Sequence, residues 1–238
     1  MTGKITIHIP GATPHFTRPE LLTMPNVPPP MHGVAPRNIL GRAWWKQTRQ
    51  TAITVNNDCC WTCGRHSSMT QGKVKSLEAH ECYDIDYPNG VMNFFGVAAL
   101  CRFCHCFIHS GRSAMLVNTG LMQQATFKAI IDHGYEILAA VGLRPWRGTR
   151  AMVELGYKAE AEPPMAPWET WRLRIPNGRE FPPLFPTEAE WVAHHASVDA
   201  ALSPEAAHAV CPLCKRPADE GGPCSHGFHA PPKGDPHG

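Results

Sequence analysis

The sequence predicts a mixed α+β protein whose centre is a hairpin and a short helix held together by four cysteines. Two Cys-x-x-Cys pairs, Cys60 with Cys63 and Cys101 with Cys104, supply those cysteines and are separated by 37 residues. Residues 77–86 alternate polar and apolar side chains, as a strand with one buried face does. Apolar side chains recur with helical spacing over residues 41–55 and 121–131, which predicts a helix on each side of the central unit.

Length and composition bound the protein class. The chain has 238 residues, of which 43% are hydrophobic, enough to bury a core in one sizeable domain or two small ones. The first residues lack the apolar segment of a signal peptide, and no stretch approaches the roughly 18 apolar residues of a membrane span. We therefore expect a cytoplasmic protein without a membrane partner, in which thiols stay reduced and clustered cysteines are metal ligands rather than disulfides.

The net charge of +2 is unevenly distributed. Residues 32–75 contain seven Lys and Arg against one acid, whereas residues 152–206 contain nine acids against four bases. A basic front half is what a module that binds polyanions needs, and a solvated basic face would have the same composition. The seven basic residues are Arg37, Arg42, Lys46, Arg49, Arg65, Lys73 and Lys75.

The pattern of proline, turn residues and cysteines divides the chain into four expected parts. High proline and glycine contents, 24 and 20 residues, predict much loop and extended structure. Residues 4–9 have the alternation of a strand, and residues 25–30 predict an extended polyproline segment lying on the domain surface. The four parts are a Pro-rich arm (1–36), a central domain (37–150), a linker with a hairpin and a helix (151–206), and a small zinc module with a tail (207–238).

Flanking helices complete the central domain. In the helix expected over residues 41–55, we expect the adjacent Trp44 and Trp45 to pack into the core rather than form a base-stacking platform. In the helix expected over residues 121–131, Phe127, Ile130 and Ile131 form the apolar side. Gly134 is expected to interrupt this helix, with one or two further turns up to Gly142.

The third part carries local signals for a hairpin and a helix. Residues 170–175 alternate as a strand, and Asn177-Gly178 predicts a tight turn because both residues tolerate positive φ. Thr187 with Glu190 forms a capping box that opens a helix to about residue 200. Ser203 followed by Pro204 predicts the start of a second helix.

Four thiols predict a structural zinc site. Each Cys-x-x-Cys pair presents two sulfurs on one side of a turn, and two pairs give the tetrahedral sulfur set that structural zinc requires. Cys59 could replace Cys60, although its spacing to Cys63 is less usual. Cys82 and Cys106 are interpreted as small buried side chains. The predicted zinc ligands are Cys60, Cys63, Cys101 and Cys104.

Three histidines surround this predicted zinc site. His80 lies in the strand-like segment, and His105 directly follows Cys104. If a helix begins at the second cysteine pair, His105 and His109 lie on one of its faces, and two imidazoles at i and i+4 can chelate a metal. The alternative is that these histidines are ordinary core residues or zinc ligands.

Residues 77–81 and 99–112 resemble the zinc-containing branch of the HNH endonuclease superfamily, which has the ββα-metal fold. In that family a hairpin and a helix enclose one divalent ion beside a histidine on the strand. The resemblance implies a metal-dependent endonuclease that hydrolyses DNA phosphodiester bonds, encoded by a phage or mobile element or serving a bacterial restriction or defence role. A phage-encoded protein would act in the host cytoplasm.

The resemblance also implies roles for individual residues. His80 corresponds to the general base, and His105 and His109 correspond to the helix positions near the catalytic metal, with Glu78 or Glu81 supplying a carboxylate. The metal could be Mg²⁺, Mn²⁺, Ni²⁺ or Zn²⁺. The implied catalytic residues are His80, Glu81 and His105; the implied ligands of the catalytic metal are His109, His105 and Glu78; and the implied DNA contacts are Arg102, Arg112, Lys73 and Lys75.

Two positions depart from the family pattern. Ala79 stands where the family usually has Asp, His or Glu, and Gly96 stands where it usually has Asn. If neither nearby glutamate compensates, His80 is itself a metal ligand and another group activates water. The departures favour an alternative from another class, a non-catalytic zinc protein that binds nucleic acid or serves in assembly while retaining the HNH scaffold.

A second cysteine group lies near the C-terminus. One Cys-x-x-Cys pair followed by a Cys and a His predicts a Cys₃His zinc site, and a mobile tail that picks up metal adventitiously is the alternative. Such a module could contact DNA or a protein partner. Its predicted ligands are Cys211, Cys214, Cys224 and His226, with His229 as the alternative histidine.

Overall fold

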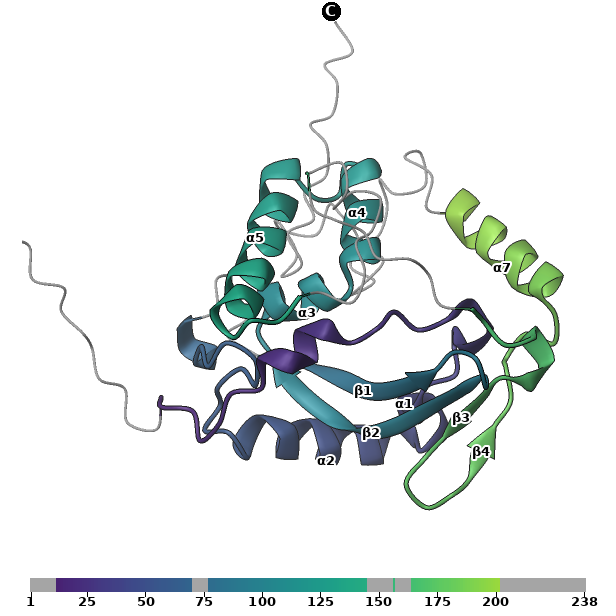
Figure 1. Ribbon diagram of the computed structural model, residues 1–238, viewed down its shortest axis with the longest axis horizontal. Coiled ribbons are helices and arrows are strands. Elements are labelled where there is room, and N and C mark those ends of the chain that lie inside the picture. The colour runs from purple at the N-terminus through teal and green to yellow at the C-terminus, as the bar shows by residue number, and fades with distance from the viewer. Residues whose placement is uncertain (1–11, 70–76, 145–155, 157–163, 202–238) are drawn as a thin grey trace, which may run out of the picture.

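The computed structural model describes residues 12–69, 77–144, 156 and 164–201 and is mixed α+β, as predicted (Figure 1). Its sheet has four strands in the order β1-β2-β3-β4. Helix α2 (Gly41–Thr54) runs along one side of the long hairpin of β1 (Glu78–Asp86) and β2 (Val91–Leu100). Three helices gather on the other side: α3 (Arg102–Ile108), α4 (Ser110–Asn118) and α5 (Gln124–Ala140) (Figure 1). No helix within the described ranges is both long and apolar enough to cross a membrane.

The β1–β2 hairpin is the centre of the fold. Strand β1 (Glu78–Asp86) pairs antiparallel with β2 (Val91–Leu100), and His80 lies opposite Ala98. The register shifts between Cys82 and Tyr83, so that Phe95 is left without a partner and is 49% exposed. β1 is an edge strand, so that one of its sides has no strand paired with it among the described residues.

The proline-rich segment before α2 contributes to the core instead of lying on the surface. It contains two short 3₁₀ helices, η1 (Pro19–Thr23) and η2 (Pro29–Met31), and the single turn α1 (Pro36–Ile39). Leu21, Leu22 and Met31 are fully buried in the main core. The prediction from proline content missed this, because the three apolar side chains that hold the segment follow no regular repeat that a sequence pattern would reveal. The strand predicted over residues 4–9 lies outside the described residues.

Helix α2 (Gly41–Thr54) forms where the apolar spacing predicted it. Ala52 is buried, and Trp44 and Trp45 are half-buried against the core cluster. Trp44 meets Phe94 of β2 with ring centroids 6.0 Å apart. The tryptophans therefore act as packing residues, as expected.

Three helices follow β2. They are α3 (Arg102–Ile108), α4 (Ser110–Asn118) and α5 (Gln124–Ala140). The predicted break at Gly134 is wrong, because α5 continues through this residue. The predicted start at Leu121 is also wrong, because α5 begins at Gln124. A Cβ built on Gly134 would lie 2.1 Å from the Phe107 ring, so glycine lets α3 approach α5 closely. The cost of glycine in a helix, about 1 kcal/mol relative to alanine, is offset by this packing.

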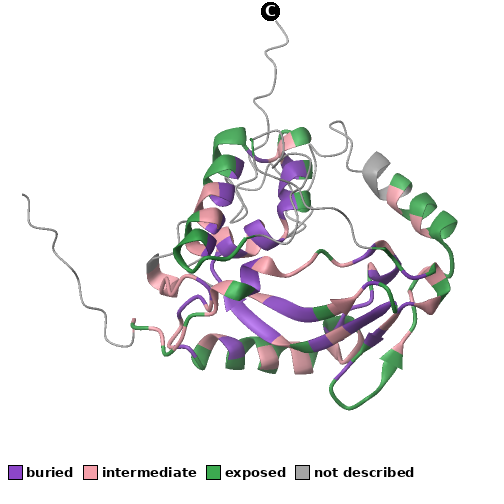
Figure 2. Ribbon diagram, in the orientation of Figure 1, coloured by how far each residue is buried: buried purple, intermediate pink, exposed green. Residues whose placement is uncertain are grey.

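The C-terminal part of the described chain extends the same sheet. Strand β3 (Arg172–Arg174) pairs parallel with β2, and β4 (Glu180–Phe181) returns antiparallel after the predicted turn. The strand is shorter than predicted because residues 168–170 form the 3₁₀ helix η4 (Trp168–Thr170). Trp171 and Leu173 are fully buried, so this segment shares the main core (Figure 2).

Helix α7 (Glu188–Ala201) begins at the predicted capping box. The backbone N–H of Glu190 donates to Thr187 Oγ1 at 3.3 Å, and the Thr187 hydroxyl is 3.3 Å from the Glu190 carboxylate. Trp191 on this helix donates its ring N–H to His32 Nδ1 at 3.1 Å, which attaches α7 to η2. The second helix start at Ser203 lies outside the described residues.

Candidate metal centres

The four predicted zinc ligands come together. One ligand atom from each of Cys60, Cys63, Cys101 and Cys104 lies within 4.8 Å of the other three, and the four residues could hold one metal ion. The Cys63 and Cys101 sulfurs are 3.7 Å apart, close to the about 3.8 Å expected for two thiolates on a tetrahedral zinc. The predicted convergence of the thiols is therefore confirmed, and the donor set fits zinc.

One cysteine pair precedes the hairpin in the sequence and the other follows it, and the backbone brings the two pairs together. Cys101 follows β2 directly and caps the start of α3, and the Cys101 carbonyl accepts the His105 N–H at 2.9 Å. Trp61, between the first two cysteines, donates its backbone N–H to Ala99 of β2 at 2.9 Å. Both pairs are thus fixed to the same end of β2.

The remaining cysteines point elsewhere. The Cys59 thiol donates to the Ala12 carbonyl oxygen at 2.9 Å, which leaves Cys60 as the member of the cluster. Cys82 is buried and donates weakly to the His80 carbonyl oxygen. Hydrogen bonding among the four clustered thiols lowers the pKa of Cys60 to about 6 and lowers that of Cys63, while the pKa values of Cys101 and Cys104 are raised, so that without a metal the four share their protons unequally.

The three histidines form a second group that could hold a metal ion. His80 on β1, His105 on α3 and His109, where α3 ends, bring one ring nitrogen each to within 4.8 Å of the others. The His80 and His109 ring centroids are 4.9 Å apart. The i, i+4 spacing predicted that His109 would lie within the helix. It lies instead at the junction between α3 and α4, with φ −93° and ψ 40°.

A carboxylate orients one of the three imidazoles. His105 Nδ1 donates a hydrogen bond to Glu78 Oε2, across from β1 to α3. In metal sites a carboxylate partner of this kind fixes the tautomer and direction of a ligating imidazole. Because Glu78 engages Nδ1, Nε2 is the nitrogen of His105 that is left to bind a metal.

Burial keeps two of the imidazoles neutral. Desolvation, with smaller contributions from the other two histidines and Arg37, lowers the pKa of His80 well below its usual value. Desolvation and the nearby charges of His105, Arg112 and Arg37 lower the pKa of His109 to about 3. Neutral imidazoles carry a lone pair that can bind a metal or accept a proton.

Glu81 is engaged by Arg37. The backbone N–H of Arg37 donates to Glu81 Oε1 at 3.0 Å, and the guanidinium lies 3.3 Å from Oε2. Glu81 is buried, and its carboxylate helps raise the pKa of the neighbouring Tyr83, whose main cause is burial. The side chain predicted to be catalytic therefore anchors the single turn α1 to β1.

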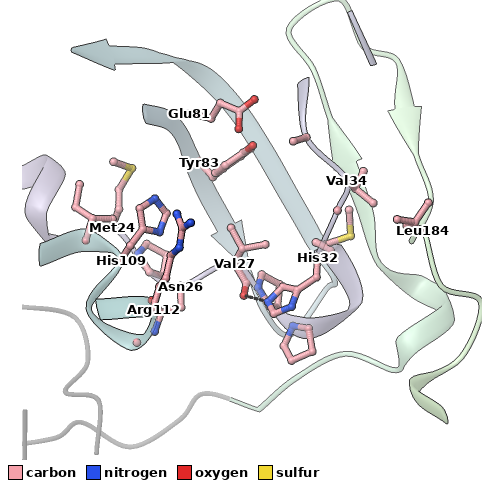
Figure 3. A pocket seen from close by; sticks show the side chains of 18 of the residues that line it. Met24, Asn26, Val27, His32, Val34, Glu81, Tyr83, His109, Arg112 and Leu184 are labelled. Atoms are coloured by element: carbon pink, nitrogen blue, oxygen red, sulfur yellow. Dashed lines mark hydrogen bonds between the residues drawn. The ribbon is translucent and has the colours of Figure 1, made fainter. Parts of the chain in front are cut away.

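The histidine group opens into a cavity of about 880 Å³. In Figure 3, His109 and Arg112 lie on one wall, Glu81 and Tyr83 project from β1, and His32 lies at the far end beside Val27. The Val27 carbonyl oxygen and His32 Nε2 are 3.1 Å apart. The proline-rich segment and the residues before α7 complete the wall, so the cavity gives the histidines access to a ligand.

The other predicted site residues have different outcomes. Arg112 is exposed and lines the cavity, and Arg102 is half-buried at the start of α3. Gly96, which stands at the family's Asn position, lies opposite Cys82 in the hairpin. The nearest asparagine, Asn93, lies three residues earlier in β2 and is paired with Asp84. The remaining predicted residues lie outside the described ranges: Lys73, Lys75, Cys211, Cys214, Cys224, His226 and His229.

Two residues at these sites were missed by the sequence reasoning. His133 on α5 places Nε2 3.5 Å from the Cys104 sulfur, and Arg37 reaches the buried Glu81. Neither belongs to a local motif. Arg37 was counted only within a basic region, and His133 had no signal other than being a histidine in an amphipathic helix.

Comparison with known proteins adds no relative. No family model matches the chain, and no curated protein or solved structure matches it either.

Proposed function

We propose that the protein is a metal-dependent endonuclease of the HNH, ββα-metal type that hydrolyses phosphodiester bonds in DNA. The observation that carries this proposal is the convergence of His80, His105 and His109 on a strand and a helix end, beside an accessible cavity. The nearby four-thiol cluster, which fits zinc, fixes the start of the helix that carries His105. DNA is preferred over RNA because of the sequence resemblance.

The proposed metal ligands are His105 and His109, with Glu78 orienting His105. Imidazole nitrogens suit several divalent ions, and a bound ion would stabilise the negative charge that develops on the phosphate and the leaving oxygen. Arg112 lies on the same cavity wall as His109, where a guanidinium can contact a neighbouring phosphate.

His80 is proposed as the general base. Its imidazole is neutral, so that a ring nitrogen can accept a proton from an attacking water, and the burial that lowers its pKa also makes it a weaker base than an exposed histidine. It also lines the cavity, through which that water and the phosphate can reach it. The proposal assigns Glu81 to positioning, because both of its oxygens are engaged by Arg37.

A plasmid-nicking assay tests this function. Purified protein is incubated with supercoiled plasmid and Mg²⁺, Mn²⁺, Ni²⁺ or Zn²⁺, beside a His109→Ala variant. We expect nicking with at least one ion, and loss of nicking in His109→Ala while its zinc content at the four thiols is unchanged. Absence of nicking by the wild-type protein with every ion would contradict the proposal.

The competing candidate is a non-catalytic zinc protein that binds nucleic acid or serves in an assembly. The observation that favours it is Gly96: its chain neighbours aside, no atom of the described residues lies within 4 Å of its Cβ position, so no described side chain takes the place of the family's Asn. Ala79, beside His80, likewise supplies no polar group. Under this candidate, DNA is bound without being cut, which the same assay with a gel-shift lane distinguishes.

A further inference from the structure

We propose that one side of α2, formed by Arg42, Lys46 and Arg49, binds the backbone of the duplex DNA whose scissile phosphate lies at the histidine group. We call these three residues the basic row. The inference rests on the proposed function, since it names where the same substrate continues beyond the cavity. It is carried by the placement of charge on α2 and by a chain of contacts from that helix to Glu81, which lines the same cavity as His80.

The three basic residues lie together and are exposed. Arg42, Lys46 and Arg49 are spaced at i, i+4 and i+7, and at 3.6 residues per turn this spacing places them on one side of a helix. The rise from the first to the last is about 10 Å at 1.5 Å per residue. Three cations along such a line can meet successive phosphates of one strand.

Charge is confined to that side of α2. Helix α2 contains no acidic residue, so the basic row has no partner within its own helix. The neighbouring exposed side, roughly 100° further round the helix at 3.6 residues per turn, carries the uncharged Ala43, Gln47, Gln50 and Thr54. A general solvated face would be expected to mix charges around the helix. The segregation therefore indicates an anionic partner that approaches from one direction.

The basic row lies on the other side of the hairpin from α3 and is connected to the candidate active site through Trp45 and Arg37. Arg42 and Arg49 are three residues before and four residues after Trp45, so helical geometry makes both neighbours of that indole. The Arg37 guanidinium carbon lies 5.9 Å from the centroid of the Trp45 ring.

Arg37 completes the path to the histidine group. It lines the cavity, and its guanidinium lies 3.3 Å from the Glu81 carboxylate. Glu81 directly follows His80 in β1, where successive side chains point to opposite faces, and both residues line the cavity. A DNA strand entering the cavity at the histidines can therefore continue past Arg37 onto the basic row.

The test measures DNA binding separately from cleavage. The variant Arg42→Gln/Lys46→Gln/Arg49→Gln removes the basic row, and glutamine preserves helix propensity. The matched control Ala43→Glu/Gln47→Glu/Gln50→Glu changes the net charge by the same −3 on the neighbouring exposed side of the same helix. Both are made in the His80→Ala background, so that a fluorescein-labelled duplex stays intact, and circular dichroism checks that each variant is folded.

We expect the plot of log binding constant against log salt concentration to lose about two to three units of slope in the basic-row variant. Its affinity at low salt should fall roughly 10- to 100-fold, whereas the control should lose about threefold or less. Equal losses in both variants, or no loss in the basic-row variant, would overturn the inference. A protein that binds as expected but never nicks plasmid would retain the inference and lose the nuclease proposal.

Discussion

The imidazole rings of His80 and His109 lie with their centroids 4.9 Å apart, one on β1 and the other where α3 ends. Their approach depends on where α3 begins, because Cys101 caps its first turn and Cys104 lies within it. A metal held by the four thiols would therefore fix the helix that presents two of the three histidines. Folding at the thiol cluster and the geometry of the histidine group are therefore linked through one short helix.

The first prediction concerns the thiol cluster. Cys101→Ser should lose one zinc per chain relative to the wild type and should unfold the central hairpin and α3, because binding of structural zinc and folding are coupled. Elemental analysis and circular dichroism measure the two effects. Cys59→Ser is the matched control, since the Cys59 thiol donates to Ala12 and should be dispensable for zinc. Equal zinc content in all three proteins would contradict the assignment.

The second prediction concerns the carboxylate behind His105. Glu78→Gln should weaken the affinity of the histidine group for Ni²⁺ or Mn²⁺ by about 10- to 100-fold, as loss of an orienting partner typically does. Calorimetric titration of the zinc-loaded protein measures this affinity. Glu81→Gln should disturb Arg37 but leave the metal affinity nearly unchanged. The assignment of Glu78 fails if both variants bind the ion as tightly as the wild type.

The third prediction concerns the contact between α3 and α5. Gly134→Ala should reduce the free energy of unfolding by about 1–3 kcal/mol, because the added Cβ overlaps the Phe107 ring. Gly96→Ala, where the added methyl meets nothing, should leave stability unchanged or raise it by up to about 1 kcal/mol. Urea denaturation measures both. Adding Phe107→Leu to Gly134→Ala should recover part of the loss, and a purely additive double variant would argue against this contact.

The fourth prediction concerns pH and the attachment of α7. His32 accepts the Trp191 ring N–H, and burial, with the nearby charge of His195 as a smaller cause, lowers its pKa. The unfolded chain therefore binds more protons than the folded one as pH falls below about 6.5, so His32 makes the protein less stable toward acid. Urea denaturation between pH 7 and pH 5 measures this loss.

The matched variant for this prediction is His32→Gln, which can still accept the Trp191 hydrogen bond but cannot be protonated. Its stability should fall less between pH 7 and pH 5 than that of the wild type, with His194, His195 and the buried histidines of the other site common to both proteins. Parallel pH profiles for the two proteins would show that His32 does not contribute.

Local patterns predicted the parts of the structure that local residues determine. The spacing of the two cysteine pairs predicted the thiol cluster, and the capping box at Thr187 predicted where α7 begins. The capping box depends on two residues that are three positions apart, and each cysteine pair lies in a tight turn that presents two ligands together. Trp44 and Trp45 were likewise predicted as packing residues from helical spacing alone.

The features that the sequence did not predict depend on tertiary contacts. Gly134 has the sequence signature of a helix break, but its role is to leave room for the Phe107 ring, which a Cβ at this position would overlap. The pairing of Arg37 with Glu81 joins residues far apart in the chain, and Glu81 in a strand pattern carries no sign of its partner. The burial of Leu21 and Leu22 follows from the shape of the core rather than from any periodicity.

The most direct test of the central claim is single-turnover cleavage of a labelled DNA duplex by wild-type and His80→Ala protein, with the metal that supports nicking. Loss of the general base should slow cleavage by about 10²- to 10⁴-fold. Binding of the duplex, measured in parallel, should stay within about threefold because it depends on Arg and Lys side chains. Cleavage by His80→Ala at the wild-type rate would contradict the assignment of this histidine group as the catalytic site.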